Sequence, residues 1–397
     1  MMRSELYEIS FFKQFSCTIK DCPNTCCKGW RVIFDEETYR RYLAEPGKNG
    51  IRLRSSIKKI NEEVYFRTSL KACTFYEKEG TCNLQRTLGV DYMPKVCRLY
   101  PRFYQHYGSF AEETLFLSCP EAARLFLTHL EDLSFVKSER EIAYECWGTN
   151  EDEPFLKWLR ELREEMIMEI WDETRSRLQI FAQLVAVMWE IQNRCIKGNE
   201  LPPAKELIQK HKNAGELHIP AQITDQMLTN GFYHSRLKKI SPKLYELCRL
   251  YFQVFDRLTP EQADLRAGEL TKKLHKDHPQ LEHMLRGYVV YYLQMVFLEV
   301  YEDYSFVKKL AGGIMHVHML EMFLALYNNS QVGHWKKTMP RIFAQRKRTP
   351  DKHPANRLDS DELAYLISVY ERRGRHNEDV AEGMYEKFYP ILQEWYQ

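Results

Sequence analysis

Eight cysteines lie between residues 17 and 119, far above ordinary cysteine usage for a segment of this length. They are Cys17, Cys22, Cys26, Cys27, Cys73, Cys82, Cys97 and Cys119. The same segment holds a single histidine, His106, so a metal bound there would be held mainly by sulfur. Thiolate ligands without imidazole favour zinc or an iron–sulfur cluster. The eight thiols therefore predict a metal site in the N-terminal part of the chain.

Two local details favour iron over zinc. Cys22-Pro23 and Cys119-Pro120 repeat the Cys-Pro pairing of some ferredoxins. A zinc ribbon would use two CxxC pairs, and the chain contains no CxxC. The alternative is that these residues are small buried apolar side chains, which free cysteine often is. Their clustering favours the metal.

The elements around the cysteines predict how they are brought together. A turn at Glu79-Gly80 would bring Cys73 and Cys82 close to each other, and Pro94 begins the segment that carries Cys97. Four basic residues close in sequence are expected either to stabilise thiolates or to form a solvated face. They are Arg86, Lys95, Arg98 and Arg102.

The hydrophobic pattern predicts a mainly α protein with a small, mixed, cysteine-rich metal-binding region at its N-terminus. Residues 1–130 are expected to form the metal-binding domain, residues 131–150 the boundary, and residues 150–397 a helical domain. Apolar residues recur at spacings of three and four throughout the second part. The helical segments expected from this pattern are 155–170, 176–196, 242–255, 281–301, 304–327 and 362–370.

Composition excludes several classes of protein. The 397-residue chain is 44% hydrophobic and 28% charged, as a folded globular protein is. Its net charge of +2 gives no reason to expect nucleic acid as a partner. No apolar run reaches the length of a membrane span, and the first residues lack the apolar core of a signal peptide. We expect a cytoplasmic protein, where clustered cysteines indicate metal binding or catalysis rather than disulfides.

Other possible sites carry weaker signals. Neither GxGxxG nor GxxxxGK[ST] is present, so no nucleotide fingerprint is found. His316 and His318 are two residues apart in a helical segment, so their rings face different sides and a structural role is expected. A basic tract over residues 336–352 is expected to be a solvated loop. No spacing identifies a catalytic residue or a cofactor pocket.

Several motifs together resemble one family. They are Cys22-x3-Cys26-Cys27-x-Gly29-Trp30, Cys73-x-Phe75, Cys82-Asn-Leu, Cys97-Arg-x-Tyr-Pro101-Arg102 and Ser118-Cys119-Pro120-Glu121-Ala122-Ala123. The chain resembles the bacterial flagellin lysine-N-methylases (FliB-like), and its front part also resembles the broader CxxxCC zinc- or iron-chelating domain. The resemblance covers residues 10–130. Thr74 departs from it, since relatives commonly have proline after that cysteine.

The resemblance implies methyl transfer from S-adenosyl-L-methionine to surface lysines of flagellin by a protein that carries a [4Fe–4S] cluster, with zinc as the alternative metal. The motifs frame Cys73, Cys82, Cys97 and Cys119, which are expected as core ligands. Cys22 and either Cys26 or Cys27 come next, because adjacent cysteines chelate one metal poorly. Two readings remain beside the enzyme: a metal-chelating protein without catalysis, and an electron-transfer protein. The large helical part favours the enzyme.

Overall fold

The computed structural model describes residues 2–29, 31–69, 72–77, 80–144, 153–232, 237–330 and 359–397. The basic tract at 336–352 and Trp30 of the quoted motif lie outside the described residues. The strands are β1 (Met2–Ile9), β2 (Ile57–Ile60), β3 (Glu63–Phe66), β4 (Thr68–Ser69), β5 (Ala72–Cys73), β6 (Arg102–His106), β7 (Phe110–Leu115) and β8 (Phe135–Tyr144).

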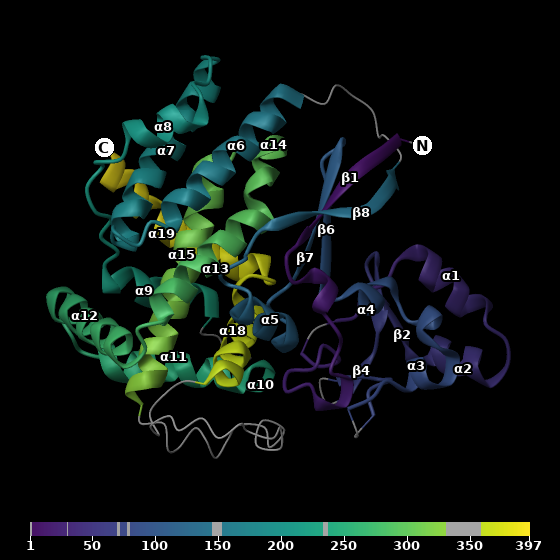
Figure 1. Cartoon of the computed structure of the whole chain (residues 1–397). Helices are drawn as coiled ribbons and strands as arrows, with labels where there is room; N and C mark the ends of the chain where they lie inside the picture. Colours follow the sequence, from purple (N-terminus) through teal and green to yellow (C-terminus); the bar gives the residue numbers. More distant parts are fainter. Residues whose placement is uncertain are drawn as a thin grey trace.

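The helices of the first half are α1 (Glu36–Ala44), α2 (Gly47–Ser56), α3 (Asn83–Leu88), α4 (Lys95–Leu99), α5 (Pro120–Thr128), α6 (Glu153–Ile170) and α7 (Arg177–Lys197). Those that follow are α8 (Ala204–Lys210), α9 (Ala221–Met227), α10 (Leu237–Ile240), α11 (Pro242–Phe255), α12 (Pro260–Asp277), α13 (Leu281–Val296), α14 (Val300–Asp303), α15 (Phe306–Asn329), α18 (Ser360–Gly374) and α19 (Glu378–Tyr396). The fold is mainly α with a small mixed sheet, which confirms the predicted class (Figure 1).

The first strand lies inside the main sheet rather than at its edge. The strand order is β6-β7-β1-β8. β1 runs parallel to β7, with Glu5 opposite Phe110, and antiparallel to β8, with Glu5 also opposite Glu141. The N-terminal residues are thus part of the sheet, and β7, which begins at Phe110, is the partner that pairs with β1 in parallel. The sheet therefore joins segments that are more than a hundred residues apart in the chain.

The described residues form two hydrophobic cores. The smaller one belongs to residues 31–99, which we call the cysteine-rich lobe. It consists of Val32, Phe34, Tyr42, Leu53, Val64, Phe66, Phe75 and Leu84. The larger core runs from the sheet through α5 into the helices, so Phe110 and Phe126 share it with helical residues such as Leu285. Figure 1 shows the lobe beside the sheet, on the side away from most of the helices.

The helices around α15 form the interior of the larger part. α15 has an 18-residue window apolar enough to cross a membrane by length and composition, but 89% of that window is buried inside the protein. It packs against α7, α12, α13 and α19. A capping box between Ser176 and Gln179 begins α7, and Gly198 ends it with a φ of 66°, which a side chain would disfavour. The six predicted helical segments are confirmed.

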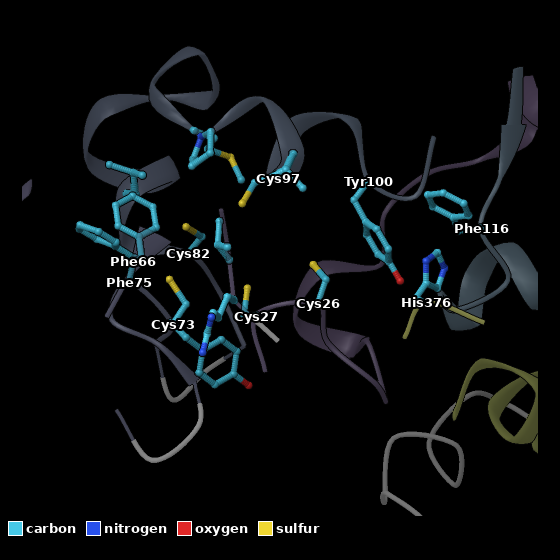
Figure 2. A pocket seen from close by; sticks show the side chains of 17 residues that line it. Cys26, Cys27, Phe66, Cys73, Phe75, Cys82, Cys97, Tyr100, Phe116 and His376 are labelled. Atoms are coloured by element: carbon cyan, nitrogen blue, oxygen red, sulfur yellow. The ribbon is translucent and has the colours of Figure 1, made fainter. Parts of the chain in front are cut away.

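α18 connects the helical part to the cysteines. It packs along α5, whose first residue, Pro120, follows Cys119. The end of α18 and the residues just after it lie beside the cysteine-rich lobe, as Figure 2 shows for His376. Residues near position 375 are thus brought to cysteines near position 25.

Candidate metal centre

A cavity of about 300 Å³ lies between the cysteine-rich lobe and the end of α18. Five of the eight predicted cysteines line it: Cys26, Cys27, Cys73, Cys82 and Cys97. Figure 2 shows the sulfur atoms of Cys27, Cys73, Cys82 and Cys97 turned toward one another, with Cys26 set apart on the side of Tyr100. We call this space the thiol cavity. Its other walls are mainly aromatic and aliphatic, from Phe66, Phe75, Tyr76, Leu84 and Phe116 among others.

Local structure aims main-chain N–H groups at several of these sulfurs. The main-chain N–H groups of Phe75, beside Cys73, and of Gln85 and Leu84, beside Cys82 at the start of α3, favour the thiolate forms of these two cysteines. N–H groups near a sulfur in this way also tune metal–sulfur centres. A β-bridge pairs Tyr76 with Cys82, and Gly80 has a φ of 85°; Glu79 of the predicted turn lies outside the described residues.

Burial works against ionisation of these thiols in the metal-free protein. Burial raises the pKa of Cys73 to about 12, and it also raises the pKa of Cys82 and Cys97. The neighbouring cysteines raise these pKa values further, because thiolates close to one another repel. The pair Cys26 and Cys27 differs, because their mutual hydrogen bond lowers the pKa of Cys27 and raises that of Cys26. A bound metal ion reverses this balance, since its charge deprotonates a coordinating thiol.

The other three predicted cysteines form a second group. Cys119 interacts electrostatically with Cys22 and Cys17, and Cys22 with Cys17. Cys119 occupies the N-cap of α5, where the main-chain N–H groups of Ala122 and Glu121 favour its thiolate form. Cys119 was expected beside Cys73, Cys82 and Cys97, but the structure places it with Cys17 and Cys22. The ligand roles of all eight cysteines stay predictions.

The donor set fits a soft metal or an iron–sulfur cluster better than a hard ion, because five thiols face the thiol cavity and no carboxylate lines it among the described residues. The cavity of about 300 Å³ is larger than a single metal ion needs, because even a water molecule takes up only about 30 Å³ in the liquid. Among the residues that the structure describes, no three Cys, His, Asp or Glu side chains form a ready-made metal site. Binding would draw the sulfurs closer together than they stand.

Three residues from the C-terminal part of the chain border this region, and sequence reasoning missed them. Arg372 donates hydrogen bonds to the carbonyl oxygen of Thr25 (3.0 Å) and to Oδ1 of Asn24 (2.9 Å). Arg373 donates to the carbonyl oxygen of Gly29 at 2.6 Å. His376 lines the thiol cavity itself. Their sequence, Arg372-Arg-Gly-Arg-His376, resembles any charged helix end, so no local signal identifies them.

Two of the four basic residues expected near the thiolates, Arg86 and Arg102, contact other groups. Arg86 pairs with Glu77 at 2.7 Å, an interaction that leaves Arg86 mostly exposed. The guanidinium of Arg102 lies over the rings of Phe12 and Phe15, at 5.8 and 5.1 Å. The cations that lower the pKa of Cys27 are Arg372 and Lys28.

A short hydrogen-bonded chain closes one end of the thiol cavity. The hydroxyl of Tyr100 lies 3.0 Å from Oγ of Ser118, which lies 2.9 Å from Nε2 of His376. Tyr100 and His376 line the cavity together with Phe116, and the rings of Phe116 and His376 meet edge to face at 4.3 Å. Tyr100 and Ser118 stand within the motifs Cys97-Arg-x-Tyr-Pro and Ser-Cys-Pro-Glu-Ala-Ala, so the sequence held a signal for them.

The two histidines of α15 are structural, as predicted. Nδ1 of His316 is 2.7 Å from the hydroxyl of Tyr370, and Nε2 of His318 is 2.7 Å from Oγ1 of Thr224. Burial lowers the pKa of His316 to about 3 and that of His318 to about 4, so both rings are neutral at pH 7.

No protein-family model matches the chain, and no solved structure matches it. Several curated proteins are similar to part of the chain. The chain is 28% identical over 149 residues to the lysine-N-methylase of Salmonella typhimurium (strain LT2) and 29% identical over 150 residues to that of Salmonella choleraesuis (strain SC-B67). Each match covers 36% of this chain and 37% of the relative, so the chain spans just over a third of the length of these methylases.

A third relative is covered more completely. The flagellar biosynthetic protein FliU of Salmonella muenchen is 30% identical over 130 residues, which make up 30% of this chain and 75% of FliU. Three curated proteins thus match this chain at 28–30% identity, and one of them, FliU, is covered over most of its own length. The chain belongs to the family of the lysine-N-methylases and FliU.

Proposed function

We propose that this protein transfers methyl groups from S-adenosyl-L-methionine to the ε-amines of lysines on flagellin. The observation that carries the proposal is the similarity to two lysine-N-methylases, with the flagellar name of the third relative supporting flagellin as the substrate. The reaction would take place in the cytoplasm, before flagellin is exported.

The thiol cavity has the properties that this reaction requires. An amine attacks a sulfonium methyl only after it has lost its proton, and a lysine ammonium has a pKa of about 10.4 in water. Apolar walls disfavour the ammonium, and aromatic faces such as those of Tyr100 and Phe116 attract a sulfonium. The site is also partly open to solvent, as a protein substrate demands.

We further propose that the thiol cavity holds a [4Fe–4S] cluster. Cys27, Cys73, Cys82 and Cys97 would hold it, because their sulfurs face a common space and nearby main-chain N–H groups favour the thiolate forms of Cys73 and Cys82. Held by all four cysteines, such a cluster would lock the lobe in place. If only three of them bound it, the remaining iron would be free to hold the methionine end of the methyl donor. The group of Cys17, Cys22 and Cys119 offers a second set of thiols.

Co-expression with a flagellin tests the activity. Intact-mass measurement of that flagellin should show whole numbers of added methyl groups, and the donor should bind the purified protein. Flagellin that stays unmodified, together with no donor binding, would leave a chelating or electron-transfer protein instead.

Metal analysis after anaerobic purification tests the cluster. Iron and labile sulfide are expected, and stoichiometric zinc without sulfide would rule the cluster out. Cys73→Ser and Cys97→Ser should each lower the metal content, whereas Cys195→Ser, on α7 outside the cavity, should not. Cys119→Ser and Cys22→Ser then show whether the second thiol group binds metal, because loss of only part of the iron would place a separate ion or cluster there.

A further inference from the structure

A guanidinium stands at the mouth of the thiol cavity. Among the described residues, Arg31 is the one Arg, Lys, Asp or Glu that lines this cavity. Its side chain is 58% exposed, so it lies where the cavity opens to solvent. A ligand that enters the cavity from solvent therefore passes a fixed positive charge before it reaches the sulfurs.

The backbone and a buried ring set the position of Arg31. The next residue pairs with β3, where the carbonyl oxygen of Val32 accepts from the N–H group of Phe66 at 3.3 Å. The guanidinium carbon of Arg31 lies 5.0 Å from the centre of the Tyr65 ring, and Tyr65 is only 6% exposed. An arginine stacked on a ring in this way keeps the N–H groups at its edge available to a ligand.

The ion pair of Arg31 has the two charges that an α-amino acid group requires. Nη1 of Arg31 donates to Oε2 of Glu63 at 3.2 Å, and the side chain of Glu63 is 51% exposed. Because an exposed ion pair contributes little to stability, this one can open at small cost. A guanidinium then takes a carboxylate, in one or two hydrogen bonds, and the carboxylate of Glu63 takes an ammonium.

The proposed function supplies a ligand that carries this group. One end of S-adenosyl-L-methionine is an α-amino acid, joined by a short methylene chain to the sulfonium. If all four cysteines of the proposed cluster bind it, no iron is left to hold that end. Groups of the chain itself then have to hold it.

We propose that Arg31 and Glu63 bind the α-amino acid end of the methyl donor. The guanidinium of Arg31 holds the carboxylate, and the carboxylate of Glu63 holds the ammonium. The sulfonium then lies further inside the thiol cavity, beside its apolar walls. This inference rests on the proposed function, and it gives the two residues a role in binding and orienting the donor.

Decarboxylated S-adenosylmethionine is the matched probe, because it keeps the sulfonium and the primary amine and lacks only the carboxylate. Anaerobic titration calorimetry of the metal-loaded protein with the two ligands measures what the carboxylate contributes. The wild type should bind the complete donor roughly tenfold more tightly, which is the lower end of the range for a hydrogen bond to a charged group, because Arg31 is exposed. Equal affinity for the two ligands would overturn the proposal.

Arg31→Met should abolish this preference by weakening the complete donor roughly tenfold and leaving the decarboxylated ligand unchanged. Arg31→Lys keeps the charge but loses the planar fork, so it should restore only part of the preference. Lys28→Met is the matched control, since Nζ of Lys28 lies 4.5 Å from the centre of the Tyr76 ring, and that ring, unlike Lys28, lines the cavity. A preference that survives in Arg31→Met, or that Lys28→Met also abolishes, would contradict the assignment.

Glu63→Gln tests the ammonium half of the site. The decarboxylated ligand gives the clearer result, because it carries the amine and makes no use of Arg31. Its affinity should fall roughly 2- to 5-fold, as for an exposed ion pair. Glu62→Gln, which changes the exposed acid next to it, should leave that affinity unchanged. Equal affinities in the wild type and in Glu63→Gln would contradict the role of Glu63.

The same measurements separate this inference from the proposed function. If the wild type methylates flagellin and Arg31→Met keeps the full preference for the complete donor, the inference alone is refuted. If the wild type binds the complete donor through Arg31 but leaves flagellin unmodified, the methylase is refuted and the binding site is kept. A wild type that binds neither ligand would refute both.

Discussion

The guanidinium of Arg372 donates a hydrogen bond to the main-chain carbonyl of Thr25, at 3.0 Å and across 347 residues of sequence. The same side chain also contacts Asn24, and Arg373 contacts Gly29, so two neighbouring arginines hold the loop that carries Cys22, Cys26 and Cys27. The loop has little regular structure of its own, apart from one short turn near residue 20. Its shape therefore depends on the end of α18.

Arg372→Met should destabilise the protein and weaken metal retention. Arg372 is only 6% exposed, so its loss leaves carbonyl groups of the loop buried without their donor. We expect the free energy of unfolding to fall by about 2–4 kcal/mol, as for the loss of charged hydrogen bonds at a buried site. Urea denaturation and metal analysis measure both effects. Arg249→Met is the control, because its ion pair with Glu246 is exposed and should contribute less than about 1 kcal/mol. Equal stability of the two variants would contradict the anchoring role.

A buried ion pair ties the sheet to the helices. Both Nη atoms of Arg163 on α6 donate to Glu112 on β7, at 2.8 and 2.6 Å, and both side chains are 2% exposed. Arg163→Met should cost about 3–5 kcal/mol of unfolding free energy, because Glu112 is left buried and unpaired. Adding Glu112→Leu should restore much of that loss, which denaturation of the double variant will show. Lys157→Met, which removes an exposed pair with Glu161, should change stability by less than about 1 kcal/mol.

Two glycines predict opposite effects of the same substitution. A Cβ on Gly312 would lie 2.1 Å from the hydroxyl oxygen of Tyr292 in the middle of the core, so Gly312→Ala should destabilise by about 1–3 kcal/mol. A Cβ on Gly268, on the exposed face of α12, meets nothing within 4 Å. Gly268→Ala should therefore stabilise by about 0.5–1 kcal/mol, since alanine favours helix. Thermal melting of both variants measures these changes in stability. If Gly312→Ala proved more stable than the wild type, α13 and α15 would be packed less tightly than the structure indicates.

Stability should fall as the pH drops from 7 to 5. The unfolded chain protonates His316 and His318 near pH 6.5, whereas burial keeps both neutral in the folded protein down to about pH 4. The unfolded state therefore binds more protons in this window, and the free energy of unfolding should fall by roughly 1–2 kcal/mol for each histidine. Glu321 adds to this fall in stability only at pH values below about 5, because its pKa is lowered from 4.5 in the unfolded chain to about 2 in the folded protein.

Urea denaturation at several pH values measures this slope. His318→Gln should reduce it, and His218→Gln should leave it unchanged, since His218 is exposed and its side chain is 72% accessible. A slope that does not depend on His318 would mean that the acid sensitivity arises elsewhere.

Helices with a continuous apolar face could be predicted from the sequence, whereas helices with few buried apolar residues or an interrupting proline were missed. The segment 242–255 has a continuous apolar face and forms α11 as predicted. α12 was missed because it buries only Leu270 and Leu274. α19 was missed although Val380, Met384, Phe388 and Leu392 recur every four residues, because Pro390 interrupts the segment. Tertiary contacts stabilise helices that their own sequences only weakly specify.

For the candidate site, too, the sequence predicted local features but not the contacts between segments that are far apart in the chain. The eight cysteines were identifiable from their clustering, and the turn between Cys73 and Cys82 from local residue types. Their division into a cavity group and the group of Cys17, Cys22 and Cys119 depends on how α5 and α18 pack, which no spacing in the sequence encodes. The same is true of His376, which reaches the cavity from the other end of the chain.

The contact between Arg372 and Thr25 also sets an order of events during synthesis. The anchor of the loop that carries Cys26 is synthesised 347 residues after the loop, which takes about 17–70 s at rates of about 5–20 residues per second. For that interval the thiols near residue 25 are made but not held. Metal delivered to a nascent chain would meet a loose loop, so durable loading has to wait until α18 has been made and packed.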